Sequence, residues 1–196
     1  MKPWETSGAQ VRAILAAIFF IALAGTASAQ WRTRTSTDQM TGHQSVIAST
    51  LASVPVTNSI GTRETPRLIV RCRENELNVI VTFASSLFST FDDDGTPAEL
   101  RVDDEHVVGT SWDSSDDGKG LFYNGAAPYQ DPAPVGDQST VGLIRRMMAG
   151  NTLHVRFHPP LNSAQYTRFI LSGSTAALEP ILRACGVATN EATAPQ

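Results

Sequence analysis

The stretch Arg67–Ala84, RLIVRCRENELNVIVTFA, determines the fold class, because it reads as two strands joined by a tight turn. In a strand, successive side chains point to opposite faces, so alternation of apolar and polar residues indicates one buried face. The residues predicted to face inward are Leu68, Val70, Cys72, Leu77, Val79, Val81 and Phe83. Glu74 and Asn75 supply the turn between the two segments, and the whole stretch predicts a β-hairpin.

Working outward from this hairpin, further segments have strand patterns. They are Ser45–Ser53, Ala98–Asp103, His106–Trp112, Gly120–Tyr123, Thr152–His158 and Tyr166–Leu171. Thr57–Pro66 has turn residues, and the polar stretch 31–43 is expected to pack only through Trp31.

Two helices are predicted late in the chain. Thr140–Ala149 has helical spacing, with Asp137 or Ser139 as its N-cap and Gly150 as its end. Thr175–Cys185 is the second helix and contains Pro180, which removes an intrahelical hydrogen bond unless the helix kinks or begins there. The predicted fold is mainly β, or α+β, with an antiparallel sheet or a β-sandwich and two short helices.

Composition bounds the classes of protein that the chain can belong to. It has 196 residues, of which 41% are apolar and 17% charged, which fits one globular domain and excludes a disordered chain or a coiled coil. Its 15 basic and 19 acidic residues give a net charge of −4. This balance suggests no basic face large enough for a run of phosphates, so nucleic acid is not expected as a partner.

The first 29 residues predict a secretory signal peptide. Lys2 and Arg12 precede the apolar run Ala13–Ala24, and Ala27–Ala29 supplies an A-x-A cleavage site. The run is shorter than the ~20 residues that a transmembrane helix needs, so no membrane anchor is expected after cleavage. The expected organisation is a signal peptide (1–29), one β-rich domain (30–186) and a disordered tail (187–196), in a periplasmic or secreted bacterial protein.

Cys72 and Cys185 are the only cysteines. In an oxidising compartment such a pair predicts a disulfide, with two buried free thiols as the alternative. A bridge would join a strand of the first half to the last helix. In the chain-entropy model, a loop of about a hundred residues is worth about 4.7 kcal/mol of stability.

No catalytic or metal motif emerges from the remaining chemistry-bearing residues. His154 and His158 lie on a strand pattern, where four residues span about 13 Å, too far for one metal ion. Residues 113–118 (DSSDDG) resemble the start of a calcium loop, but Asn124 stands where the loop needs a bidentate Glu, so an acidic hairpin tip is the favoured interpretation. No cofactor is expected.

The candidate binding residues are Trp112, the acidic cluster Asp113, Asp116 and Asp117, and the pair Arg145–Arg146. Trp112 is either a core strand residue or an exposed recognition aromatic. The arginine pair either forms a solvated helix face or binds an anion or a partner.

Several segments together resemble the VasI/TagO family of periplasmic proteins associated with bacterial type VI secretion. They are PRLIVRCREN (66–75), LRVD (100–103), WDSS (112–115) leading to Leu121–Phe122, FILSG (169–173), and the final helix ending in ACG (184–186). The resemblance implies a non-enzymatic accessory role in assembling or regulating the secretion apparatus. It also supports a bridge between Cys72 and Cys185.

Three functions follow as hypotheses. The first is an exported, disulfide-stapled binding module that acts through protein contacts. The second is a periplasmic inhibitor or immunity protein against a cell-wall hydrolase or toxin, with the acidic loops 92–94 and 113–117 mimicking a charged ligand. The third is a hydrolase.

Overall fold

The computed structural model describes residues 31–58, 60–86, 95–126, 137–159 and 163–188. The expected signal peptide, the acidic run Asp92–Asp94, most of the loop 125–136 and most of the tail 187–196 lie outside these residues.

The described chain forms strands through most of its length and adds two helices late. The strands are β1 (Arg32–Thr37), β2 (Gln44–Val54), β3 (Val56–Thr57), β4 (Arg63–Glu64), β5 (Arg67–Arg73), β6 (Glu76–Thr82), β7 (Thr96–Val102), β8 (Val108–Ser114), β9 (Gly120–Ala126), β10 (Thr152–Phe157) and β11 (Gln165–Ile170). The helices are α2 (Thr140–Ala149) and α3 (Ser174–Ala184).

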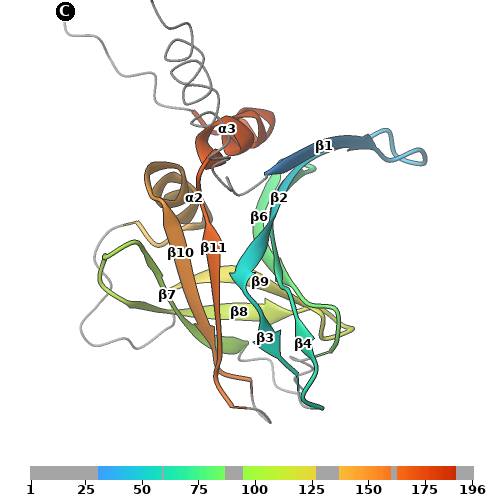
Figure 1. The fold of residues 1–196 in the computed structure, drawn as a ribbon. Helices are drawn as coiled ribbons and strands as arrows, with labels where there is room; N and C mark the ends of the chain where they lie inside the picture. The colour runs from blue at the N-terminus through green and yellow to red at the C-terminus, as the bar shows by residue number, and fades with distance from the viewer. Residues whose placement is uncertain (1–30, 59, 87–94, 127–136, 160–162, 189–196) are drawn as a thin grey trace, which may run out of the picture.

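Eight of these strands close into an antiparallel barrel, shown in Figure 1. The order around the ring is β2-β11-β10-β7-β8-β9-β6-β5, and β5 returns to pair with β2. The prediction of a mainly β fold with an antiparallel sheet and two late helices is therefore confirmed. The sheet closes on itself and does not divide into the two packed sheets of a sandwich.

Strand β2 changes partner along its length, and this change leaves β1 outside the ring. Residues 45–51 of β2 pair with β5 on one side. On the other side, residues 44–49 pair with β1, whereas Ala52 and Val54 pair with β11. Strand β1 therefore extends the sheet beyond the barrel wall as an added ninth strand (Figure 1).

The predicted β5–β6 hairpin forms with the expected faces. Arg73 pairs with Glu76 across a two-residue turn, and Glu74 and Asn75 both have positive φ, 54° and 63°. Two successive positive φ values are typical of the type I′ turn that matches the twist of paired strands. Leu68, Val70 and Cys72 are buried in the core, as the alternation predicts.

Aromatic side chains fill the barrel interior. Trp112 is fully buried, and its ring makes edge contacts with Tyr123 at 5.3 Å and Phe157 at 5.4 Å between centroids. Its indole Nε1 donates a hydrogen bond to Thr110 Oγ1 at 2.9 Å, which satisfies the one polar atom of the buried ring.

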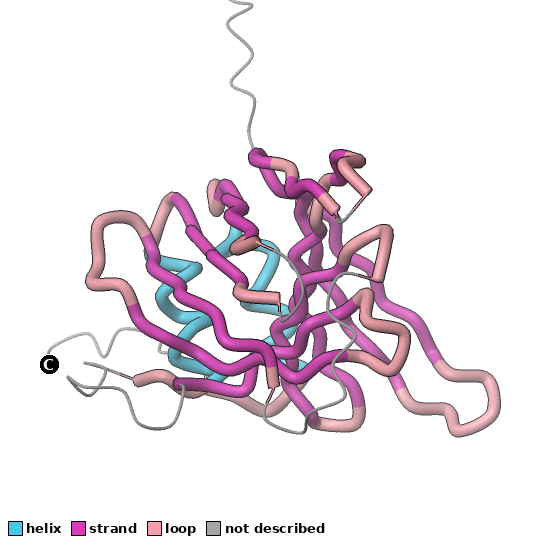
Figure 2. The backbone as a smooth tube through the Cα atoms, turned by 90° about the horizontal axis from the view of Figure 1, so that it is seen from below, coloured by secondary structure: helices cyan, strands magenta, loops and turns pink. Residues whose placement is uncertain are grey.

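Both helices lie together at one end of the barrel, as Figures 1 and 2 show. Of the two predicted caps, Ser139 caps α2, because its hydroxyl accepts the Gly142 N–H at 3.1 Å. Helix α3 begins at Ser174 and continues through Pro180. Among the described residues, no helix has the length and apolar character needed to cross a membrane.

A disulfide joins Cys72 in β5 to Cys185 at the end of α3, with an S–S distance of 2.02 Å and a sequence separation of 113. This confirms the predicted bridge, and it fits an oxidising compartment outside the cytoplasm. The bond ties the last helix to the barrel wall.

Two segments differ from the sequence-based prediction. Residues 32–37 form β1, although the stretch was predicted to pack only through Trp31; Trp31 itself does pack against the core. RTRTST has no apolar residue, so only pairing with β2 reveals it as a strand. Within the predicted turn region, β3 and β4 form a small two-stranded sheet.

Candidate functional site

The strand register gathers one set of outward-facing side chains on β1, β2, β5, β6 and β9. Residues paired across antiparallel strands point to the same side of a sheet. One row of paired residues reads Arg32, Ser49, Ile69, Ile80 and Phe122. The adjacent row reads Arg34, Ile47, Arg71 and Asn78. Arginines from two strands far apart in the sequence thus face the same side.

These side chains line a groove on the outside of the barrel, with a volume of about 790 Å3. We call it the arginine groove, and its residues are Arg32, Thr33, Arg34, Ile47, Ser49, Arg67, Ile69, Arg71, Ile80, Thr82, Phe83, Ser115, Asp117, Lys119, Gly120 and Phe122. Ile47, Ile69, Ile80 and Phe122 give the groove an apolar floor. Ile80 points away from the barrel interior, but it is only 4% exposed because neighbouring side chains cover most of it.

Four guanidinium groups surround this floor, and among the described residues none of them has a carboxylate partner. Arg71 Nε donates to Asn78 Oδ1 at 3.0 Å, and the Arg71 guanidinium lies over the Phe122 ring, 5.6 Å from its centroid. Arg67 Nη1 donates to Ser49 Oγ at 3.5 Å. In the described part of the chain, no ion pair involves Arg32, Arg34, Arg67 or Arg71.

Asp117 is the one carboxylate among the described residues that line the groove, and it already accepts hydrogen bonds within its own turn. Asp117 Oδ1 accepts the Ser115 hydroxyl at 2.7 Å and the Lys119 backbone N–H at 3.1 Å. These bonds, the Ser115 hydroxyl first, hold the pKa of Asp117 below its usual value. Because Lys119 adds a further cation, the lining carries a clear positive excess.

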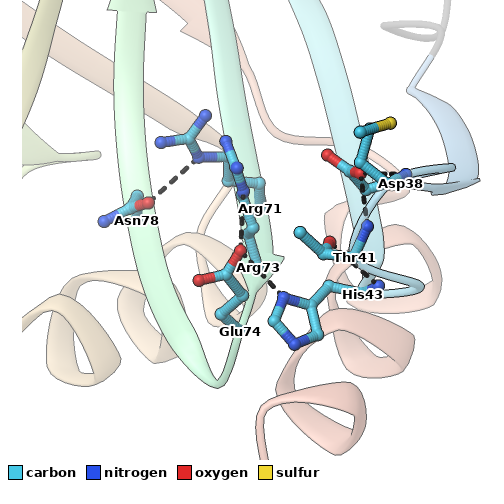
Figure 3. Close-up of polar contacts among 8 residues, drawn as sticks. Asp38, Thr41, His43, Arg71, Arg73, Glu74 and Asn78 are labelled. Atoms are coloured by element: carbon cyan, nitrogen blue, oxygen red, sulfur yellow. Dashed lines mark hydrogen bonds and ion pairs between the residues drawn. The ribbon is translucent and has the colours of Figure 1, made fainter.

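A cluster of paired charges lies beside the β5–β6 turn, two residues beyond Arg71 along β5 (Figure 3). Glu74 Oε1 lies 3.1 Å from His43 Nδ1 and 3.4 Å from Arg73 Nε. The hydrogen bond from His43 is the main cause of a lowered pKa at Glu74. Asp38 Oδ1 accepts two backbone N–H groups of its own turn, those of Met40 and Thr41. Arg73 is therefore paired, in contrast to the four arginines of the groove.

Of the binding residues predicted from sequence, only Asp117 reaches the groove. Trp112 belongs to the core, so its alternative as an exposed recognition aromatic is excluded by its full burial. Asp113 and Asp116 are exposed near the tip of the β8–β9 hairpin, and the Asn124 amide lies 3.4 Å from Asp113 Oδ1.

The predicted pair Arg145–Arg146 lies on α2 and faces other parts of the fold. Arg145 donates to the Ala188 carbonyl at 3.4 Å, and Arg146 pairs with Glu105 at 3.2 Å. Arg146 also donates to Gln138 Oε1. This pair does not join the groove.

Residues 115–119 connect β8 to β9, as expected for a hairpin tip. Within the described residues, no cluster of three or more His, Cys, Asp or Glu side chains is arranged to hold a metal ion. His154 stacks on Tyr166 and shares a 2.8 Å hydrogen bond with its hydroxyl.

The alternation in RLIVRCR places Arg67, Arg71 and Arg73 on the outer face of β5, but it does not connect them with Arg32 and Arg34. The signal is present in the alternation of arginine and threonine in RTRTST. It becomes interpretable only when this stretch is recognised as a strand.

Comparisons of the chain with protein-family models, curated proteins and solved structures found no match.

Proposed function

We propose that this protein is an exported, non-enzymatic binding protein that recognises an acidic, partly aliphatic segment of a partner protein in the arginine groove. The observation that carries the proposal is the set of four arginines around an apolar floor, none of them paired with a carboxylate in the part of the chain that the structure describes. Such a site offers charge-assisted hydrogen bonds to carboxylates and apolar contact to aliphatic side chains.

The floor of the groove favours a peptide over a nucleic acid. Sites for single-stranded nucleic acid present open aromatic faces on which bases stack. Here three isoleucines form most of the floor, and the guanidinium of Arg71 already covers the Phe122 ring. Aliphatic side chains of a peptide fit such a surface better than bases do.

The resemblance to the VasI/TagO family and the disulfide both support a role outside the cytoplasm. The proposed partner is then a protein of the periplasm: a component of the secretion apparatus under the first hypothesis, or a hydrolase or toxin under the second. Under either hypothesis, an acidic segment of the partner is the part that the groove recognises. The partner captured from periplasmic extract distinguishes the two.

The test compares peptide binding by matched variants. The probe is a fluorescein-labelled peptide that alternates Glu and Val, with a Gln-for-Glu peptide as its control. The variant Arg34→Gln/Arg71→Gln removes two groove cations, and Arg63→Gln/Arg101→Gln removes two cations outside the groove. Fluorescence anisotropy gives Kd, and circular dichroism checks that each variant is folded.

We expect the groove variant to bind about 30-fold more weakly, or about 1 kcal/mol for each lost charge-assisted contact, and the control variant to bind as wild type does. Equal binding of the Glu and Gln peptides would contradict the proposal. Tighter binding of an oligothymidylate than of the acidic peptide would contradict it as well.

A further inference from the structure

The outer edge of β1 is an open strand edge beside the arginine groove. In the described part of the chain, β1 pairs with β2 and with no other strand. All six of its side chains are exposed. A strand of this length offers an edge of about 20 Å, along which backbone N–H and C=O groups face solvent.

The side chains of β1 are sorted by charge between its two faces. Arg32 and Arg34 face the groove, in register with Ser49 and Ile47 of β2. By strand alternation the side chains of Thr33, Thr35 and Thr37 point to the opposite side, although Thr33 still contributes atoms to the groove wall. A strand added to the open edge would place every second side chain on the groove side, within about 5 Å of an arginine neighbour.

Charge complementarity selects the occupant of this edge. A second copy of β1 is disfavoured, because the strand has no acidic residue to pair with its arginines, and a self-pairing centred on Arg34 sets that residue against itself. Like charges directly opposite each other destabilise a strand pair. Carboxylates at alternate positions would instead meet Arg32 and Arg34.

We infer that β1 receives an acidic stretch of the partner segment as an added β-strand, with alternate acidic side chains facing Arg32 and Arg34 at the rim of the arginine groove. This inference rests on the proposed function and specifies how the ligand binds. Backbone hydrogen bonds along β1 hold the segment, and the arginines select its sequence.

The two alternate sets of peptide N–H groups provide the test. In an added strand only one set donates to β1, while the other set faces away. Two versions of the Glu-Val peptide are therefore compared by anisotropy, one N-methylated at every Glu and the other at every Val. The protein is expressed as the full chain, so that its own export signal is processed.

We expect one methylated peptide to bind about 30-fold more weakly, the effect of losing about two backbone hydrogen bonds, and the other to bind within about threefold of the parent. Hydrogen exchange measured by mass spectrometry should show added protection of residues 32–37 in the complex. Equal affinities for the two methylated peptides would overturn strand addition.

The outcomes separate this inference from the proposed function. If binding depends on Arg34 and Arg71 but not on which peptide nitrogens are methylated, the groove recognises acidic segments without adding a strand. If no acidic peptide binds, both proposals are wrong. A dimer by size-exclusion chromatography that protects residues 32–37 without ligand would assign the edge to a second copy.

Discussion

Removal of the Cys72–Cys185 disulfide should cost this protein a large part of its stability. The change is Cys72→Ala/Cys185→Ala, which deletes both sulfurs and leaves no unpaired thiol. Cys72 is 4% exposed and packs within the barrel core, whereas Cys185 is only partly buried at the end of α3. Each substitution removes only one sulfur atom from the folded protein, so the main effect of the double substitution is expected on the unfolded chain.

The magnitude follows from the loop that the bond closes. The two cysteines are 113 residues apart, so the unfolded chain regains the freedom of a very long loop when the bridge is lost. The chain-entropy relation gives about 4.7 kcal/mol for a loop of this order. For a domain of about 150 residues or more, each kcal/mol shifts the melting temperature by about 2–4 °C, so Tm should fall by about 10–19 °C.

Thermal unfolding followed by circular dichroism measures this shift, with oxidised wild-type protein as the reference. Wild-type protein melted in reductant serves as the control and should match the variant. Hydrogen exchange should also rise in α3, which the bridge holds against β5. A variant that melts within about 3 °C of the oxidised wild type would refute the reasoning, as would ready thiol labelling of the native wild-type protein.

Three further predictions concern single residues. Asp103 accepts the N–H groups of Asn151 at 3.0 Å and Thr152 at 2.8 Å, so Asp103→Ala should lower the free energy of unfolding by about 2 kcal/mol in urea titrations. Ser139→Ala removes the N-cap of α2 and should lower the free energy of unfolding by about 1 kcal/mol, whereas Ser139→Asp should keep most of the capping stabilisation. Equal losses of stability in the two variants would contradict a capping role. Burial raises the pKa of Tyr123 above its unfolded value of about 10. The stability that this neutral phenol contributes is fully present below the unfolded pKa and is lost as the pH rises through the folded pKa. Alkaline unfolding followed by fluorescence should therefore be shallower in Tyr123→Phe, and an unchanged profile would contradict this assignment.

Much of the barrel could be predicted from local pattern, because alternation in strands such as β5 and β10 directly reports which face is buried. Leu68, Val70 and Cys72 illustrate this, since each is buried as predicted. Closure of the sheet could not be predicted in the same way. It depends on β2 exchanging β1 for β11 as its partner at Ala52, and no local feature of SVIASTLAS encodes that exchange.

The candidate site was missed for a related reason. Composition describes the chain as mildly acidic, and a total charge says nothing about where charges gather. Arg34 and Arg71 are brought to one face by two successive strand registers, through Ile47 of β2. By contrast, conspicuous residues such as Trp112 belong to the core, because an aromatic ring serves packing as readily as recognition.

Because cations gather in the arginine groove, charge is distributed unevenly over the surface of the protein. The chain as a whole carries −4, so the surface outside the groove bears an even larger negative surplus. An anionic partner is therefore attracted to the groove side more strongly than to the net acidic remainder of the chain. Association should then be accelerated by long-range electrostatic steering toward a single orientation, and the on-rate should fall steeply as ionic strength screens the field.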